Sequence, residues 1–226
     1  MNQEKNKYKI LNLYACLGGN RYKWDEVADI QVTAVELDPE LAKLYKERFP
    51  NDTVIVADAH QYLLDNYKEF DFIWTSPPCP THSRARGWNT KIETKYPDMK
   101  LYEEIILLET VSKGEFPRFK GKYCVENVIP FYEPLIPAKK RGRHLYWTNF
   151  NLSNVLSDRK GVKIGKDRDE VNKWCKYHDY DFYKYKGKQP INKIARNLVD
   201  YQAGKTILQT ALNIQRASKT NQTKLF

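Results

Sequence analysis

Short hydrophobic runs alternate along this chain with stretches in which hydrophobic residues recur every three or four positions. The short runs are typical of buried strands, and the longer period is typical of helices that cover them. The runs predict strands at residues 9–14, 31–37, 53–57, 71–75, 122–126 and 144–150. The longer period predicts helices at about residues 21–28, from Pro39 onward, at 99–113, and around 207–214. This alternation predicts an α/β fold, with a mostly parallel sheet and helices on both faces.

One long segment breaks the alternation. Residues 151–195 lack the regular pattern and are rich in lysine and aromatic residues, so we expect them to form a small insert. The sequence therefore predicts a cofactor-binding and catalytic domain at 1–150, the insert at 151–195, and a returning C-terminal helix within 196–226. Residues 216–226 are expected to form a polar tail.

Length and composition limit the possible classes. The 226 residues are enough for one α/β domain with a small insert. The chain has no apolar stretch of about twenty residues, and residues 1–9 are polar, so neither a membrane span nor a signal peptide is expected. Its four cysteines form no C-x-x-C pair, so we expect no disulfide scaffold and no metal site. Cys175 and His178 would be only half of a metal site.

The net charge of +10 favours a partner that carries phosphate. The cations gather at residues 84–95, 139–143 and 173–188, and in the third cluster they alternate with aromatic residues. Cations suit phosphates and aromatic rings suit stacking on bases or sugars. The alternative is that these rings form a small local core.

The most distinctive motif is Ser76-Pro77-Pro78-Cys79-Pro80, which follows the predicted strand at 71–75. Proline fixes φ and removes a backbone donor, so this segment is a stiff, non-helical turn. A thiol presented on such a turn can act as a nucleophile when its surroundings favour the thiolate.

Three other stretches accompany this motif. A hydrophobic run ends in Gly18-Gly19, the next strand ends in Glu36-Leu37-Asp38, and a later strand ends in Glu126-Asn127-Val128. Arg141-Gly142-Arg143 follows. In this order, the Pro-Cys, the Glu-Asn-Val and the Arg-x-Arg resemble the motifs of the DNA (cytosine-5)-methyltransferase family. The resemblance covers most of residues 9–150 and, more weakly, 196–214, and it implies a Rossmann-like methyltransferase fold.

The expected cofactor site lies beyond the carboxyl ends of the strands, where open α/β sheets bind ligands. Gly18 and Gly19 let the backbone pass close to a ligand. Glu36 can accept hydrogen bonds from ribose hydroxyls, and Asp58 from an adenine amino group. These residues alone indicate an adenosine-containing cofactor, NAD included, although the loop lacks a full G-x-G-x-x-G.

The resemblance implies that this cofactor is S-adenosylmethionine. It places Tyr14 by the methionine moiety and Leu37 against the adenine, with Ala59 and Pro78 at the same site.

The chemistry needs three groups. Carbon 5 of cytosine becomes nucleophilic when a thiolate adds to carbon 6, which requires a proton at ring nitrogen 3 and a cation near the O2 oxygen. The sequence offers Cys79 as nucleophile, Glu126 as acid with Asn127 shaping its turn, and Arg143 as cation supported by Arg141. The target base has to leave the helix stack to reach them.

The expected partner is double-stranded DNA, with no membrane and no obligate protein partner, and the chain is expected to be a monomer. The resemblance places Ser83 and Arg84 on a loop that closes over the DNA, and Arg86 in the cation cluster after the cysteine is a further predicted contact. The insert at 151–195 becomes the target-recognition segment. Further nucleic-acid contacts are predicted for Lys139, Lys184, Lys186 and Lys188.

The chain departs from the family at three places. Lys139 stands where the family has a glutamine, Cys16 where it has a turn glycine, and residues 204–207 where it has Gly-Asn-Ser-Val. The ninth motif of the family is not evident. The recognition segment of about 45 residues is short, which suggests a compact, bacteriophage-like enzyme in the cytoplasm of a bacterial or phage-infected cell.

Two other functions stay open at this point. One is an RNA cytosine-5 methyltransferase, which shares the Pro-Pro-Cys. The other is a non-catalytic nucleic-acid-binding relative, against which the complete set of Cys79, Glu126 and Arg143 argues. An enzyme that methylates amino groups is less compatible, because its Pro-Pro would precede an aromatic residue rather than Cys79.

Overall fold

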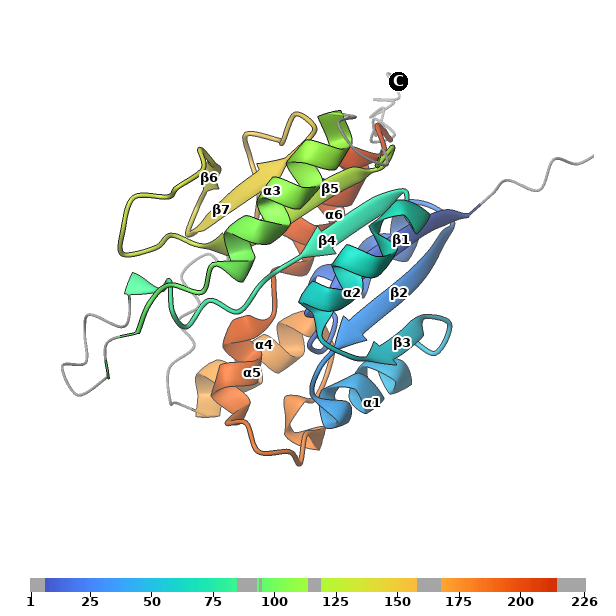
Figure 1. Cartoon of the computed structure of the whole chain (residues 1–226). Helices are drawn as coiled ribbons and strands as arrows, with labels where there is room; N and C mark the ends of the chain where they lie inside the picture. The colour runs from blue at the N-terminus through green and yellow to red at the C-terminus, as the bar shows by residue number, and fades with distance from the viewer. Residues whose placement is uncertain (1–6, 85–92, 94, 114–118, 158–167, 215–226) are drawn as a thin grey trace, which may run out of the picture.

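The computed structural model describes residues 7–84, 93, 95–113, 119–157 and 168–214. Its centre is a seven-stranded sheet with the order β3-β2-β1-β4-β5-β7-β6 (Figure 1). The strands are β1 (Tyr8–Leu13), β2 (Ile30–Glu36), β3 (Thr53–Val56), β4 (Phe72–Thr75), β5 (Lys122–Val128), β6 (Lys139–Arg141) and β7 (His144–Thr148). β1 to β5 are parallel, and β7 runs antiparallel to both of its neighbours. The predicted mostly parallel sheet is confirmed.

Helices cover both faces of this sheet, as predicted (Figure 1). The α-helices are α1 (Pro39–Arg48), α2 (Ala59–Asn66), α3 (Lys100–Lys113), α4 (Arg168–His178), α5 (Ile191–Asn197) and α6 (Tyr201–Ala211). Short 3₁₀ helices are η1 (Asn20–Glu26), η2 (Tyr67–Glu69) and η4 (Phe182–Lys184). The pattern of the sequence did not predict α2, α4 or α5, and α6 begins several residues before the helix expected there.

The alternation of side chains along β1 separates two hydrophobic cores. Leu11 and Leu13 pack with α2 and α3, whereas Ile10 packs with η1 and α6. α6 approaches η1 closely because Gly204 has no side chain, since a Cβ there would lie 2.3 Å from the carbonyl oxygen of Asn20. The returning C-terminal helix thus completes the second face of the sheet.

The described part of the insert forms short helices that pack against α1 and the loop after β1. Trp174, Phe182 and Tyr185 are buried and share a hydrophobic cluster with Leu41 and Leu44 of α1. Rings buried in this way cannot stack on bases. The structure therefore supports the alternative, in which the aromatic residues of the insert form a local core.

Two polar side chains attach these helices to the carboxyl edge of the sheet. Asp38 caps α1, and its other oxygen accepts hydrogen bonds from the Tyr185 hydroxyl at 2.6 Å and from Gln189 at 3.0 Å. The Arg48 guanidinium donates to the carbonyl oxygens of Leu17 and His178. The insert and the loop after β1 are therefore held by the same helix, α1.

None of the helices in the described ranges combines the length and apolar character that crossing a bilayer requires. Within these same ranges, no three His, Cys, Asp or Glu side chains are grouped so that they could hold a metal ion.

Candidate active site

A cavity of about 650 Å³ opens at the carboxyl ends of β1, β2, β4 and β5. The strand order reverses between β1 and β4, and this is where open α/β sheets bind their ligands. One wall comes from residues 189–199, which include α5. The cavity therefore joins the sheet to a segment that lies much later in the chain.

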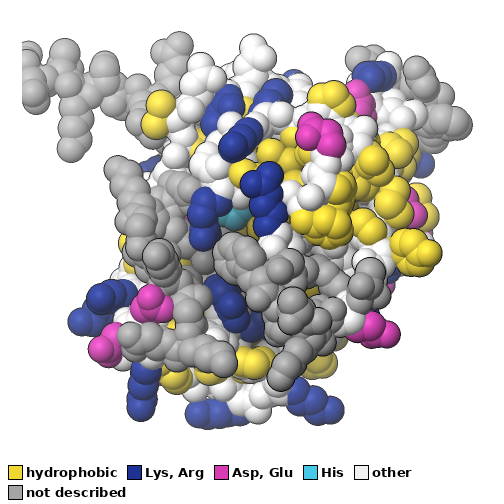
Figure 2. Space-filling view, turned by 90° about the vertical axis from the view of Figure 1, so that its left-hand side faces the viewer, with side chains coloured by type: hydrophobic (Ala, Val, Ile, Leu, Met, Phe, Trp, Pro, Cys, Tyr) yellow, Lys and Arg dark blue, Asp and Glu magenta, His cyan; other side chains and the backbone are white. Residues whose placement is uncertain are grey.

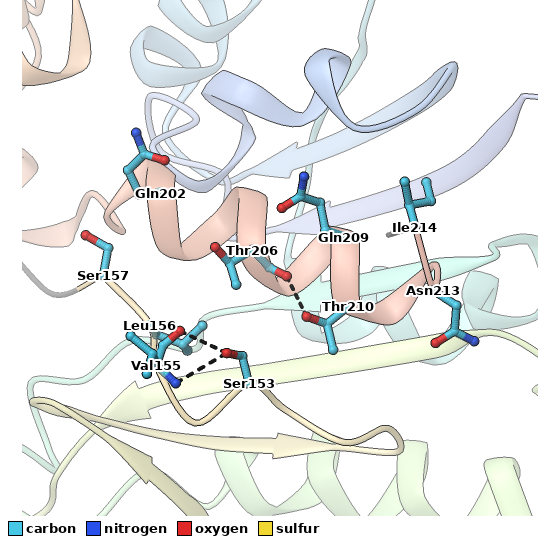
Figure 3. Close-up of a pocket in the computed structure, with 10 residues that line it drawn as sticks. All are labelled: Ser153, Val155, Leu156, Ser157, Gln202, Thr206, Gln209, Thr210, Asn213 and Ile214. Carbon is cyan, nitrogen blue, oxygen red and sulfur yellow. Dashed lines mark hydrogen bonds between the residues drawn. The ribbon is translucent and has the colours of Figure 1, made fainter. Parts of the chain in front are cut away.

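A second depression, of about 850 Å³, lies between α6 and residues 153–157. Figure 3 shows Thr206 and Thr210 on the side of α6 nearer the segment that carries Ser153, whereas the side chains of Gln202 and Gln209 point away from that segment. Its lining consists of hydroxyl, amide and aliphatic side chains. None of these side chains titrates near neutral pH, so this depression lacks the ionisable groups that line the first cavity.

Glu36 lies at the end of β2 and lines the first cavity. Its two carboxylate oxygens accept hydrogen bonds from the backbone N–H groups of Cys16 at 2.8 Å and of Asp38 at 3.0 Å. Burial raises the pKa of Glu36. The carboxylate therefore already shapes the loop after β1, and this loop forms the floor of the expected cofactor site.

The two glycines of that loop are required by the protein itself. Gly18 has φ +67°, and a Cβ there would lie 2.4 Å from the Phe49 ring. A Cβ on Gly19 would lie 2.6 Å from the carbonyl oxygen of Val199. Gly19 lines the cavity, whereas Gly18 is not among its lining residues. A direct contact with the cofactor stays a prediction for both.

The other predicted cofactor residues also line the cavity. Leu37 is 68% exposed there, an apolar side chain available to pack against a flat ring. Asp58 caps α2, and its second oxygen lies 3.3 Å from the Lys100 ammonium. Ala59 and Pro78 complete this part of the lining.

Tyr14 lines the cavity and is positioned by a buried acid. Its hydroxyl donates to Glu104 at 2.5 Å, and Glu104 also accepts from Thr75 at 2.6 Å and lies 3.1 Å from His60 Nδ1. Glu104 raises the pKa of His60. The network fixes Tyr14, whose backbone has φ +55°.

Cys79 sits on the turn that follows β4, as the motif predicted. Its carbonyl oxygen accepts from the N–H groups of His82 and Ser83, and the Asn127 side chain donates to the carbonyl oxygen of Pro77 at 3.0 Å. Asn127 thereby ties the end of β5 to the cysteine turn.

The surroundings of Cys79 act on its thiol in opposite directions. Burial and the Glu126 carboxylate raise the pKa of Cys79, while Lys193 and Arg196 of α5 lower it. Both cations line the cavity. On balance the pKa is raised, so the thiol form dominates at neutral pH.

Glu126 at the end of β5 lies in the same cavity, with 8% of its side chain exposed. The Ser76 hydroxyl donates to one carboxylate oxygen at 2.9 Å and accepts from the Trp74 indole N–H at 2.8 Å. His144 Nε2 lies 3.5 Å from the other oxygen. The structure therefore brings together Cys79, Glu126 and two residues to which the sequence assigned no role.

The predicted arginine pair is placed elsewhere. Arg141 donates to the carbonyl oxygens of Leu152 and Ser153 and to the side chain of Asn154, so it holds the segment after β7. Arg143 is exposed in the two-residue turn between β6 and β7 and does not line the cavity. Its role at the O2 oxygen stays a prediction.

The predicted nucleic-acid residues differ in their availability. The Lys139 ammonium is bound to Thr148 and to the carbonyl oxygen of Phe150, so it is occupied within the protein. Lys184, Lys186 and Lys188 are exposed on the insert. Figure 2 shows a face on which Lys and Arg side chains gather beside a broad apolar area.

The predicted loop residues are described only in part. Ser83 forms an isolated bridge with Pro130, and Arg84 is exposed and donates to the Pro130 carbonyl oxygen at 2.9 Å. Arg86 lies outside the described residues. Contacts of this loop with DNA stay a prediction.

Four functional candidates were missed from the sequence: Ser76, Glu104, His144 and the cation pair of α5. Ser76 and His144 directly flank residues or motifs that were recognised, so alternation along β7 could have suggested His144. Glu104 and the α5 cations have no local signal, because only the fold brings them to the site.

The strand order and the cavity at the strand ends define a Rossmann-like methyltransferase fold. Residues 8–110, a little under half of the chain, match the model of the C-5 cytosine-specific DNA methylase family. Over these residues the chain is similar to C-5 cytosine-specific DNA methylases, in agreement with the resemblance that its motifs indicated. The family implies S-adenosylmethionine as cofactor. A search of curated proteins gave no match.

Solved structures match parts of this chain at low similarity. A proposed DNA modification methyltransferase of an E. coli prophage has 19% identity and a TM-score of 0.37, covering 56% of this chain and 34% of its own. A DNMT2 mutant from Spodoptera frugiperda has 22% identity and a TM-score of 0.36, and the match covers 54% of this chain and 36% of DNMT2. A proposed methylase from Haemophilus influenzae has 18% identity and a TM-score of 0.42, and the match covers 63% of this chain and 85% of the methylase. This chain thus spans about a third of the first two.

Proposed function

We propose that this chain transfers a methyl group from S-adenosylmethionine to carbon 5 of cytosine in double-stranded DNA, through a covalent adduct at Cys79. The observation that carries the proposal is that one cavity contains the Cys79 thiol, the Glu126 carboxyl group and the strand-end acid Glu36. A nucleophile, an acid and a site for an adenosine cofactor are three of the parts that this reaction needs.

The residues of the cavity fit the cofactor. Its volume of about 650 Å³ suits a small-molecule site, which commonly spans roughly 300–1,000 Å³. Glu36 and Asp58 supply acceptors for ribose and adenine, and the exposed Leu37 supplies an apolar surface. Among the described lining residues, five are carboxylates and three are Lys or Arg, and this excess suits a positively charged sulfonium. The bound cofactor supplies an electrophilic methyl group.

The side chains of the protein act on the base. The Cys79 thiolate forms a bond with carbon 6, while Glu126 in its acid form donates a proton to ring nitrogen 3. Carbon 5 can then take the methyl group. Loss of the carbon 5 proton to water, return of the nitrogen 3 proton to Glu126 and breakage of the sulfur–carbon 6 bond release the product and regenerate the thiolate.

The target base is extruded from the duplex in this proposal. Carbon 6 and nitrogen 3 are inaccessible inside a stacked helix, and enzymes that modify bases flip them into a pocket. Lys193 and Arg196 lie on the wall beside Cys79, where they can neutralise the phosphate of the flipped nucleotide and favour the thiolate. The exposed Arg84 and the insert lysines can contact phosphates further along the duplex.

Nucleoside mass spectrometry tests the activity. The protein is incubated with S-adenosylmethionine and either duplex DNA or RNA, and 5-methylcytosine is quantified. We expect 5-methylcytosine in the DNA. Methylation of RNA alone would assign the chain to the RNA enzymes, and no methylcytosine in either substrate would contradict the proposal.

Duplex DNA that carries 5-fluorocytosine tests the nucleophile, because the fluorine prevents release of the adduct. Cys79→Ala should form no adduct and should lower methyl transfer by at least about a thousandfold. Cys175→Ala, a matched change on α4 outside the cavity, should behave like the wild type. An adduct with Cys79→Ala would show that another residue is the nucleophile.

A further inference from the structure

We propose that His144 exchanges protons with Glu126, so that the two side chains together form the general acid of the site. The inference rests on the proposed cytosine chemistry and deepens it. It assigns a role to a residue that the sequence motifs pass over, since His144 follows directly after the Arg-x-Arg.

The sheet register places the two side chains on one face. Val128 of β5 pairs with His144 of β7, and Glu126 pairs with Tyr146. Glu126 and His144 are therefore diagonal neighbours across an antiparallel pair, a separation that long side chains can bridge. His144 Nε2 accordingly lies 3.5 Å from Glu126 Oε1.

The other carboxylate oxygen has a partner that cannot relay protons. Ser76 accepts a hydrogen bond from the Trp74 indole, so its own hydroxyl proton points to Glu126 Oε2. An indole N–H does not titrate in the physiological range, so this chain of hydrogen bonds ends there. Among the described residues, Ser76 and His144 contact the Glu126 carboxylate through their side chains, and of these two side-chain types only an imidazole can exchange protons near neutral pH.

The two side chains differ in exposure, and this difference sets the direction in which a proton from solvent moves through the pair. The His144 side chain is 20% exposed and lines the cavity, whereas that of Glu126 is 8% exposed. Solvent therefore reaches the imidazole more readily than the carboxyl group. A proton taken up at His144 can pass from Nε2–H to Glu126 Oε1 and then to nitrogen 3 of the base.

The proton count of the pair follows from this path. The active pair holds one proton and gives it to nitrogen 3, which leaves a carboxylate and a neutral imidazole. The proton returns when the sulfur–carbon 6 bond breaks. Removing the imidazole leaves Glu126 as the only site for that proton, and a carboxyl group releases protons at lower pH than an imidazole.

Other titratable and charged groups surround the pair. The Tyr146 ring lies 6.4 Å from the His144 ring, and Arg143 directly precedes His144. Cys79 faces Glu126 from the turn after β4, and Lys193 and Arg196 face the cavity from α5. Arg141, opposite His144 in β6, is bound to residues 152–154. Lys139 is bound to Thr148 and Phe150. The neighbouring cations oppose a charge on the imidazole, so the carboxylate is the group that favours it.

The pH dependence of methyl transfer tests the proposal. The titration of the Cys79 thiol is first measured by its rate of alkylation with iodoacetamide, quantified on the Cys79 peptide. The pH at which the alkylation rate rises identifies which side of the pH–rate profile, or limb, reports ionisation of the thiol. We expect His144→Gln to move the other limb to lower pH by at least about one unit while the thiol limb stays in place.

A matched variant separates proton exchange from support. Ser76→Ala removes the other partner of Glu126, which does not titrate, so it should lower the rate without moving the second limb to lower pH. If His144→Gln also lowers the rate uniformly with both limbs in place, His144 only supports the site and the proposal is wrong. A wild-type protein without cytosine methylation would instead refute the proposed function.

A second measurement needs neither cofactor nor DNA. In the free protein, the pKa of His144 is followed by nuclear magnetic resonance in wild type and in Glu126→Gln. Loss of the neighbouring carboxylate should lower this pKa by about one unit. An unchanged value would show that the two groups are not coupled and would overturn the inference.

Discussion

The ends of β4 and β5 and the hairpin of β6 and β7 carry the two halves of the expected catalytic set, and they behave differently. At the strand ends, Cys79 and Glu126 share one cavity and are joined through Ser76 and Asn127. At the hairpin, Arg141 binds the segment after β7 and Arg143 is exposed in the turn. The structure brings the residues of the first half to one cavity, and it places those of the second half outside that cavity.

The difference follows from how each position is determined. Neighbouring parallel strands place their carboxyl ends at one edge, so residues that follow them meet. In a hairpin, each step of one residue reverses the face to which a side chain points. The residue that reaches Glu126 is therefore His144, one position after Arg143. Motif order predicts which strands meet, but it does not predict side-chain direction at a turn.

Glu126→Gln should produce the largest effect. A neutral amide keeps the contact with Ser76 but cannot donate a proton, so kcat should fall by about 10²–10⁴ with little change in cofactor affinity. Single-turnover methylation and calorimetry measure the two quantities. Glu133→Gln, an exposed change outside the cavity, is the matched control. A normal kcat in Glu126→Gln would show that Glu126 is not the general acid.

Glu36→Ala should come next and should act on binding. The loss of a charged hydrogen-bond acceptor should weaken S-adenosylmethionine by about 1–3 kcal/mol, partly because the loop at Cys16 loses its anchor. Calorimetry on the free protein measures this, with the exposed Glu47→Ala as control. A change in kcat alone, at unchanged affinity, would show that the roles of Glu36 and Glu126 are interchanged.

The three insert lysines should have a moderate and unspecific effect. Replacing Lys184, Lys186 and Lys188 with Gln should weaken binding to all DNA sequences by about tenfold and should reduce the salt slope by about 0.9 per lost phosphate contact. The control is a triple change of exposed lysines near the amino ends of strands: Lys9, Lys68 and Lys120. Equal losses in both triple variants would mean that the insert does not contact DNA.

Arg143→Gln should have the smallest effect and tests the comparison most directly. An arginine that stabilises charge on the base would cost about 10²–10³ in kcat when removed. Because Arg143 lies outside the cavity, we expect at most about a tenfold loss, seen as weaker DNA binding. A loss of a hundredfold or more in kcat would mean that the hairpin rearranges on DNA.

Arg141→Gln is the matched change on the same hairpin. It should lower the free energy of unfolding by about 1–3 kcal/mol, because it removes charged hydrogen bonds to the segment after β7. Chemical denaturation measures this, and an unchanged stability would contradict the structural role of Arg141.

Much of the sheet could be predicted because its strands are short hydrophobic runs. β1 to β5 and β7 lie within about two residues of their expected positions. β6 was missed because Lys139–Arg141 contains only charged residues, and it becomes a strand through pairing with β7. α2 was missed because it has only eight residues, although Asp58 supplies an N-cap that could have marked its start.

The residues of the site could likewise be predicted only where the local sequence carries a signal. Cys79, Glu126 and Glu36 could be predicted because each follows a recognisable strand. Lys193 and Arg196 could not, since nothing in residues 191–197 indicates which surface they face. The cysteine at position 16 was noted as a departure from a family glycine, and the structure shows why glycine suits it: the backbone there has φ +47°.

The wall formed by residues 189–199 also bears on the order in which this protein can fold. Gln189 bonds to Asp38, so two segments about 150 positions apart close the cavity together. The entropy of closing the loop between such distant segments is lost before their contact stabilises the fold, so this contact forms late. During synthesis, the sheet can therefore assemble its thiol and its acid before a binding chamber exists. A fragment ending after β7 would retain both reactive groups on a sheet that lacks α6 and this wall.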